Sequence, residues 1–110
     1  MIARIWHGWT TFENADIYEQ LLKDEVFPSI ENKKVKGYQK ISLLKRMLIQ
    51  EVEFITIMIF NDLNAVREFA GENYEIAYVP EKAQKVLSRY DESSQHYEIM
   101  NEIENHWYGQ

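Results

Sequence analysis

Apolar side chains dominate the segment from Glu51 to Phe60, which contains neither glycine nor proline. β-Branched and aromatic residues of this kind are typical of a strand. Side chains of a strand alternate between its two faces. One face carries Ile55, Ile57 and Ile59, and the other carries Val52, Phe54, Thr56, Met58 and Phe60. Because a strand that is apolar on both faces is buried on both sides, the segment is predicted to be a central strand.

A helix is predicted directly after this strand. Asp62 is a favourable N-cap, and apolar residues recur at helical spacing from Leu63 to Ala70. Gly71 follows as the stop, since glycine readily adopts the backbone conformation that ends helices. The central strand therefore feeds an amphipathic helix.

The rest of the chain shows the same two periodicities. Alternation predicts strands over residues 2–10, 37–46 and 95–100, and Gly8 in the first of these indicates a bulge or a close approach. Helical spacing predicts a helix from Asn14 to Phe27, which Pro28 ends or kinks before a polar loop over residues 29–36. Residues 81–90 are predicted to form a short charged helix or a structured loop.

This element order, β-α-β-β-α-β, is that of a ferredoxin-like α+β fold. It predicts a four-stranded antiparallel sheet with both long helices on one face. We expect one domain over residues 1–100 and a tail over residues 101–110, whose Trp107 and Tyr108 pack on a partner. The helices leave the isoleucine face of the central strand uncovered. A second copy packed sheet against sheet would cover it, so a homodimer is predicted.

Composition narrows the classes of partner. The net charge of −6 argues against nucleic acid and anionic membranes, which both require clustered cations. The absence of cysteine excludes disulfides, thiolate metal sites and a cysteine nucleophile. The longest apolar run, Phe54 to Phe60, is too short to span a bilayer, and the N-terminus lacks signal-peptide features. A cytoplasmic protein is expected.

Three local strings, ARIWHGWT, FNDLNAVREFAG and HYEI, together with the element order resemble the antibiotic biosynthesis monooxygenase-like proteins of the dimeric α/β barrel group. The resemblance covers residues 1–100. It implies a ferredoxin-like subunit, an obligate dimer whose two sheets make a barrel, and a pocket between the sheet and helices of each subunit. Some members oxygenate aromatic quinols without metal or flavin, some bind or degrade haem, and many have no known activity.

The leading function implied by this resemblance is cofactor-free oxygenation of a small aromatic or quinone-like molecule. Such a reaction needs a dry aromatic pocket and a base that deprotonates the substrate. His7 is the candidate base, because histidine titrates near neutral pH and the resemblance implies that its strand face looks into the pocket. No metal or cofactor is expected. The candidate wall residues are Trp9, Tyr18, Phe54, Met58, Phe60, Phe69 and Tyr78.

Two other interpretations remain. His7 could be a core-edge histidine bonded to the backbone, and the protein a non-catalytic small-molecule-binding or stress-related dimer. The third interpretation is haem binding or degradation. The haem-degrading branch uses an asparagine, a tryptophan and an iron-ligating histidine at positions that correspond to His7, Phe60 and residues 76–78, and all three differ here. Tyr78 or His7 could still ligate iron.

Other polar residues indicate ordinary structure. Arg4 is expected to form a cross-strand pair with Glu98 or Glu53. His96 and His106 are poorly spaced for a metal site with His7, and no metal ligands are assigned.

Overall fold

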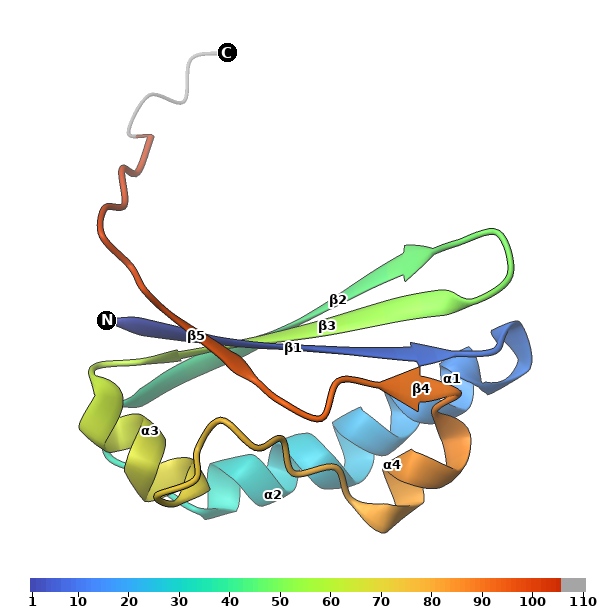
Figure 1. Ribbon diagram of the computed structural model, residues 1–110, viewed down its shortest axis with the longest axis horizontal. Coiled ribbons are helices and arrows are strands. Elements are labelled where there is room, and N and C mark those ends of the chain that lie inside the picture. The colour runs from blue at the N-terminus through green and yellow to red at the C-terminus, as the bar shows by residue number, and fades with distance from the viewer. Residues whose placement is uncertain (106–110) are drawn as a thin grey trace.

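The computed structural model describes residues 1–105 as an antiparallel sheet with its helices on one face (Figure 1). The strands are β1 (Ile2–Thr10), β2 (Tyr38–Met47), β3 (Val52–Phe60), β4 (Arg89–Tyr90) and β5 (Gln95–Glu98). The helices are α1 (Phe12–Leu21), the π-helical segment η1 (Leu22–Val26), α2 (Phe27–Asn32), α3 (Leu63–Ala70) and α4 (Glu81–Val86).

The strand order is β2-β3-β1-β4, and β5 also pairs with β1. β1 and β3 run antiparallel in unbroken register from the pair Ile2–Phe60 to the pair Thr10–Val52. This arrangement confirms the ferredoxin-like α+β fold and the central position of β3. The predicted last strand corresponds to β5, and the sheet has a fifth strand that was not predicted: β4 pairs with the other end of β1, at the end of the segment 81–90 that was expected to be a short helix or loop.

The first helical stretch is longer than predicted. Thr11 caps it by accepting a hydrogen bond from the Asn14 backbone N–H, and α1, η1 and α2 follow without a break to Asn32. Pro28 therefore does not end the helix. The Phe27 N–H bonds to the Leu22 carbonyl, a π-helical spacing that widens the turn where the proline ring enters. The expected polar loop begins only after Asn32.

Helix α3 begins and ends as predicted. The Asp62 side chain accepts a hydrogen bond from the Ala65 N–H at 2.9 Å. At the other end Gly71 has a φ of 89°, a conformation that favours glycine, and its N–H bonds to the Arg67 carbonyl at 2.7 Å. The local sequence thus determines both ends of α3.

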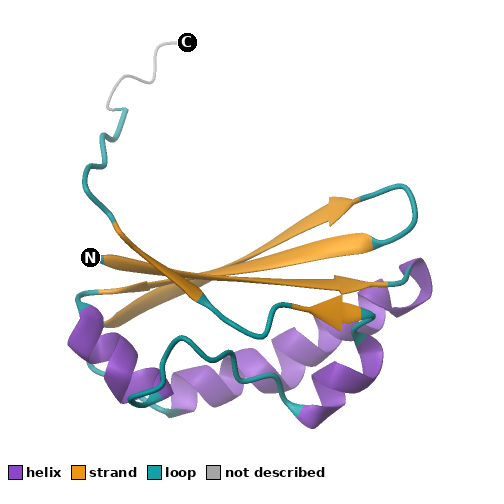
Figure 2. Ribbon diagram, in the orientation of Figure 1, coloured by secondary structure: helices purple, strands orange, loops and turns teal. Residues whose placement is uncertain are grey.

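The two faces of the sheet have different surroundings (Figure 2). The face beneath which the helices lie carries Val52, Phe54 and Phe60, each fully buried. The opposite face carries half-buried or exposed apolar side chains, and no helix of residues 1–105 covers it. These side chains are Ile5, Trp9, Leu44, Ile55, Ile57 and Ile59. We call the side of the sheet that carries these residues the open face.

After β5 the chain leaves the sheet, and Met100 and Ile103 are exposed. The predicted packing of Trp107 and Tyr108 lies outside the described residues. Within residues 1–105 none of the helices has the length and apolar character needed to cross a membrane.

Candidate functional site

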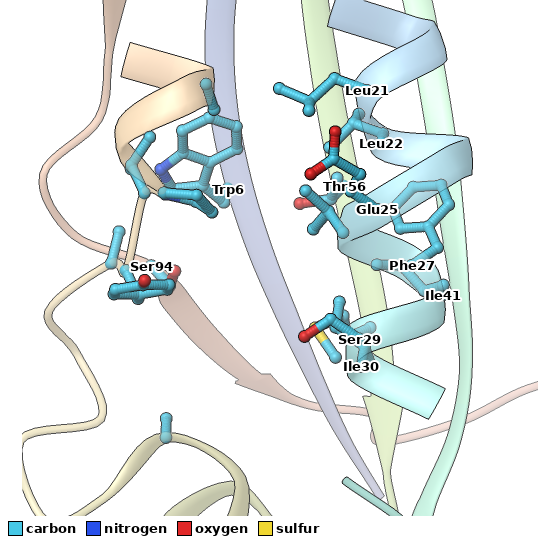
Figure 3. Close-up of a pocket in the computed structure, with 18 of the residues that line it drawn as sticks. Trp6, Leu21, Leu22, Glu25, Phe27, Ser29, Ile30, Ile41, Thr56 and Ser94 are labelled. Atoms are coloured by element: carbon cyan, nitrogen blue, oxygen red, sulfur yellow. The ribbon is translucent and has the colours of Figure 1, made fainter. Parts of the chain in front are cut away.

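A cavity of about 830 Å³ lies between the sheet and the helices. The sheet contributes Arg4, Trp6, Ile41, Thr56 and Met58 to its wall. The remaining wall comes from α1, η1 and α2, from the end of α3, from the segment between Ile76 and Ala83, and from Lys33 and Ser94. Figure 3 shows Trp6 and Ser94 on one side of the cavity and Leu21, Phe27 and Ile30 on the other. The volume is in the range of small-molecule sites.

Trp6 is held flat against its own strand. Its indole Nε1 donates a hydrogen bond to the Asp91 carbonyl at 2.7 Å. A Cβ placed on Gly8 would lie 2.6 Å from Cη2 of the Trp6 ring, so the ring occupies space that only glycine leaves free. The expected close approach at Gly8 is therefore made by the Trp6 side chain. No bulge is present, because the β1–β3 register is regular.

Arg4 is a buried cation in the cavity wall, and only 7% of its surface is exposed. Its Nη1 donates to the Tyr74 carbonyl at 2.6 Å and to Nε2 of His96 at 2.9 Å. Its guanidinium carbon lies 5.8 Å from the centre of the Phe69 ring. Burial lowers the pKa of Arg4 below its ordinary value, although a guanidinium remains protonated at neutral pH.

The expected pairing of Arg4 with Glu98 or Glu53 is wrong. In the register of β1, Arg4 stands opposite Met58 on β3 and His96 on β5. Glu98 and Glu53 instead stand opposite Ile2 and Trp9. Arg4 therefore points toward the helices, where none of the described carboxylates forms an ion pair with it.

The other charged groups of the cavity wall divide into paired and unpaired ones. Glu25 bonds to Lys82 at 2.8 Å, and Glu81 lies 3.7 Å from Lys85. Lys33 donates to the Phe69 carbonyl and lies 4.5 Å from the centre of the Phe69 ring. Arg4 and Lys33 thus flank Phe69, and neither has an acidic partner among residues 1–105.

Tyr18 supplies a neutral polar group to the same wall. Its side chain is 2% exposed and packs edge-on against Phe54, with 4.9 Å between ring centres. Burial raises the pKa of Tyr18 well above its usual range, because the phenolate would lose its hydration. The hydroxyl therefore stays protonated and can donate a hydrogen bond to a ligand.

The structure distributes the expected wall residues over three locations. Four of them line the cavity, namely Tyr18, Met58, Phe69 and Tyr78. Phe54 and Phe60 are fully buried in the core and are not part of the wall. Trp9 lies on the open face, where the Arg89 guanidinium stacks on its ring with 3.9 Å between the guanidinium carbon and the ring centre.

His7 also lies on the open face, so the expectation that its strand face looks into the pocket is not met. Its Nδ1 donates to Oε2 of Glu53 at 3.1 Å, and its ring stacks on Trp9. The face of β1 that does look into the cavity carries Arg4 and Trp6. A core-edge histidine bonded to a backbone carbonyl is not observed either, because the partner is a carboxylate.

Arg4, Trp6 and Phe27 are wall residues that were not predicted from the sequence. The signal for the first two was present, since Arg4 and Trp6 share a face with Gly8 in the β1 alternation. Within residues 1–105 no group of three or more histidine, aspartate or glutamate side chains is placed to hold a metal ion.

No protein-family model and no curated protein matches the sequence. A comparison of structures finds the crystal structure of a "putative antibiotic biosynthesis monooxygenase" from Bacillus cereus. The TM-score is 0.66, with 97% of this chain and 98% of that chain covered, at 9% sequence identity. This chain shares the ferredoxin-like fold of that protein. The resemblance seen in the sequence is thereby confirmed for the fold, and function must be argued from the site.

Proposed function

We propose that this protein is a cofactor-independent monooxygenase-type protein that takes a small aromatic or quinone-like molecule into the cavity between sheet and helices. The observation that carries the proposal is the cavity itself. Its wall is built mainly from apolar and aromatic side chains, including Trp6, Phe27, Met58 and Phe69. The flat rings of Trp6, Phe27 and Phe69 suit a flat apolar ligand.

The proposed reaction needs no external reductant. A carbon of an electron-rich phenol ring forms a bond to one atom of O₂, and the O–O bond then breaks. One oxygen atom stays on the ring as a carbonyl, and the other leaves as water with the ring hydrogen and the hydroxyl proton. The ring supplies all the electrons, so the protein binds the ring, orients it and limits access of water.

The test uses a cavity-filling variant. N-phenyl-1-naphthylamine, a neutral aromatic dye whose fluorescence rises in apolar surroundings, should bind the wild type. Thr56 lies on β3 in the cavity wall, so the indole of Thr56→Trp should occupy the cavity and abolish binding. Ile17→Trp, at an exposed position of α1 that is not part of the cavity wall, is the control and should bind as the wild type does. Absence of dye binding, or equal binding to Thr56→Trp, would overturn the proposed ligand site.

Oxygen uptake then separates catalysis from binding. Naphthols are supplied in the presence of a chelator, and consumption of O₂ with formation of the naphthoquinone, which carries one more oxygen atom than the naphthol, supports oxygenation. Binding without O₂ uptake supports the second candidate, a non-catalytic small-molecule-binding dimer. That candidate is favoured by one observation: His7, the expected base, lies on the open face and is engaged with Glu53.

We also propose that the working form is a homodimer joined through the open face. Ile55, Ile57 and Ile59 lie in a row along β3, with Ile5 beside Ile57 on β1 and Leu44 beside Ile55 on β2. A contiguous apolar surface of this kind in a water-exposed position marks an interaction site. A second copy would cover it with the same side chains.

A further inference from the structure

The guanidinium of Arg4 has one edge that is used and one that is free. Both of its hydrogen bonds start from Nη1 and end on the Tyr74 carbonyl and Nε2 of His96. Nε and Nη2 have no hydrogen-bond acceptor among residues 1–105. These two groups form the side-on edge of the guanidinium. Their N–H groups can donate in parallel to the two oxygens of a carboxylate, or together to a single anionic oxygen.

The partners of Nη1 hold this edge in place. His96, which lies on β5, accepts one hydrogen bond at Nε2. The Tyr74 carbonyl, in the loop after α3, accepts the other. The Tyr74 ring in turn packs edge-on against His96, with 5.0 Å between the ring centres. Arg4 is thus a pre-positioned cation, with little side-chain entropy left to lose when an anion binds.

The charge of the cavity wall points the same way. The two acidic wall residues, Glu25 and Glu81, are paired with Lys82 and Lys85. The two cations that flank Phe69, Arg4 and Lys33, have no acidic partner among residues 1–105. Although the protein has a net charge of −6, one end of its cavity thus presents two cations that form no ion pair with any described residue. A buried charge without a counter-charge is costly, and a bound anion would remove that cost.

We propose that the aromatic ligand of this cavity carries an anionic oxygen, either a carboxylate or an ionised ring hydroxyl, and that this oxygen pairs with the Nε–Nη2 edge of Arg4. The inference rests on the proposed function for the aromatic body and adds the charge that the ligand must bear. Arg4 is then a specificity-determining residue. Lys33, at the same end of the cavity, adds to the attraction without a fixed hydrogen-bond geometry.

The pairing also bears on the proposed reaction. An ionised ring hydroxyl is the electron-rich form of a phenol, and a cation beside it favours loss of its proton. The charge of Arg4 would thus promote the deprotonation of the ligand, the step for which His7 was predicted to be the base. The released proton passes to solvent, and solvent returns one proton to the water that leaves, so the balance given above is kept.

A matched pair of dyes tests the proposal. N-phenyl-1-naphthylamine and its 8-sulfonate share one aromatic body and differ by one anionic group. In the wild type the sulfonate should gain from Arg4. In Arg4→Met the ratio of the sulfonate Kd to the neutral-dye Kd should rise about 10-fold to 100-fold, the loss of a charge-assisted hydrogen bond. Arg4→Lys, which keeps the charge but not the fork, should give an intermediate rise.

The control is Lys36→Met, which removes one exposed positive charge that is not in the cavity wall. It should leave the ratio of the two dissociation constants as in the wild type. An unchanged ratio in Arg4→Met would overturn the anion proposal while the ligand site itself stands. Should Arg4→Met not fold, as judged by circular dichroism, an unchanged ratio in Arg4→Lys has the same meaning. Failure of the neutral dye to bind the wild type would instead overturn the proposed function.

Two natural-type ligands separate the sources of the anionic oxygen. We expect 2-naphthoate, which is ionised at neutral pH, to displace the sulfonate dye from the wild type more strongly than from Arg4→Met. With 2-naphthol, the red-shifted absorption of the bound naphtholate at neutral pH would identify an ionised ring hydroxyl. Loss of that absorption in Arg4→Met would assign the ionisation to Arg4. Absence of an Arg4-dependent effect with either ligand would overturn the proposal.

Discussion

His96 accepts a hydrogen bond from Arg4, with 2.9 Å between Nε2 of the imidazole and Nη1 of the guanidinium. Because a guanidinium can only donate, the His96 ring is neutral and carries its proton on Nδ1. Nδ1 is buried and has no partner within the described part of the chain. Burial and the neighbouring Arg4 lower the pKa of His96 below its ordinary value, and the charge of Glu75 opposes this shift.

A pH dependence of stability follows from this contact. The pKa of His96 is about 6.5 in the unfolded chain and lower in the folded one. Between these two values the unfolded chain binds more protons, so the free energy of unfolding falls as the pH drops below about 6.5. Urea unfolding of the wild type and His96→Gln at about pH 7.5 and about pH 5.5 measures the effect. The wild type should lose more stability than the variant; equal losses would contradict the assignment of a neutral His96.

Gly8→Ala should displace Trp6 from the cavity wall. The new methyl group would lie 2.6 Å and 2.9 Å from two carbons of the Trp6 ring and 3.1 Å from Cδ2 of Leu87. We expect a loss of about 1–3 kcal/mol in the free energy of unfolding, the usual cost of overpacking. Dye affinity should fall as well, because the ring must move toward the cavity. Thermal or urea unfolding and dye titration measure both effects, and wild-type values in both would show that Trp6 is not held by Gly8.

His7→Ala should leave the ligand site intact. The side chains of His7 and Glu53 are 29% and 15% exposed and lie on the open face, so their pair contributes at most about 1 kcal/mol. Dissociation constants for both naphthylamine dyes should match those of the wild type. Any O₂ uptake found with a naphthol should also persist. A loss of uptake with unchanged dye binding would return His7 to the reaction as a residue that acts from the open face.

Ile57→Glu should convert the proposed dimer to monomer. Ile57 lies at the middle of β3 on the open face, between Ile5 and Ser42 in the register. A carboxylate there would be buried against its own copy in a two-fold interface, which is strongly unfavourable. Sedimentation velocity at micromolar concentration measures the state. Ile17→Glu, the same substitution at a position of α1 that is 54% exposed, is the control and should sediment as the wild type does.

A wild-type protein that sediments as a monomer would contradict the dimer proposal directly. In that case the apolar open face would need another explanation. The cavity proposal would be unaffected, because its wall residues belong to one chain.

Local sequence determined most of the elements. Alternation located β1 and β3, and the pair Asp62 and Gly71 marked both ends of α3, because caps and periodicity act over a few neighbouring residues. The misplaced end of the first helix has a local cause of another kind. The π-helical turn before Pro28 accommodates the ring, and nothing in the sequence indicated that turn.

The sequence by itself therefore determined the elements, their order and the presence of two apolar sides on β3. The uncovered isoleucine side of β3 was also predicted, and only the tertiary structure decided which side of β1 faces the helices. The reason is that β1 carries an aromatic residue on each face, Trp6 on one and Trp9 on the other, so period-2 alternation is equally consistent with either orientation. Packing against α1 to α4 resolved this choice, and it placed Arg4 in the cavity and His7 outside it.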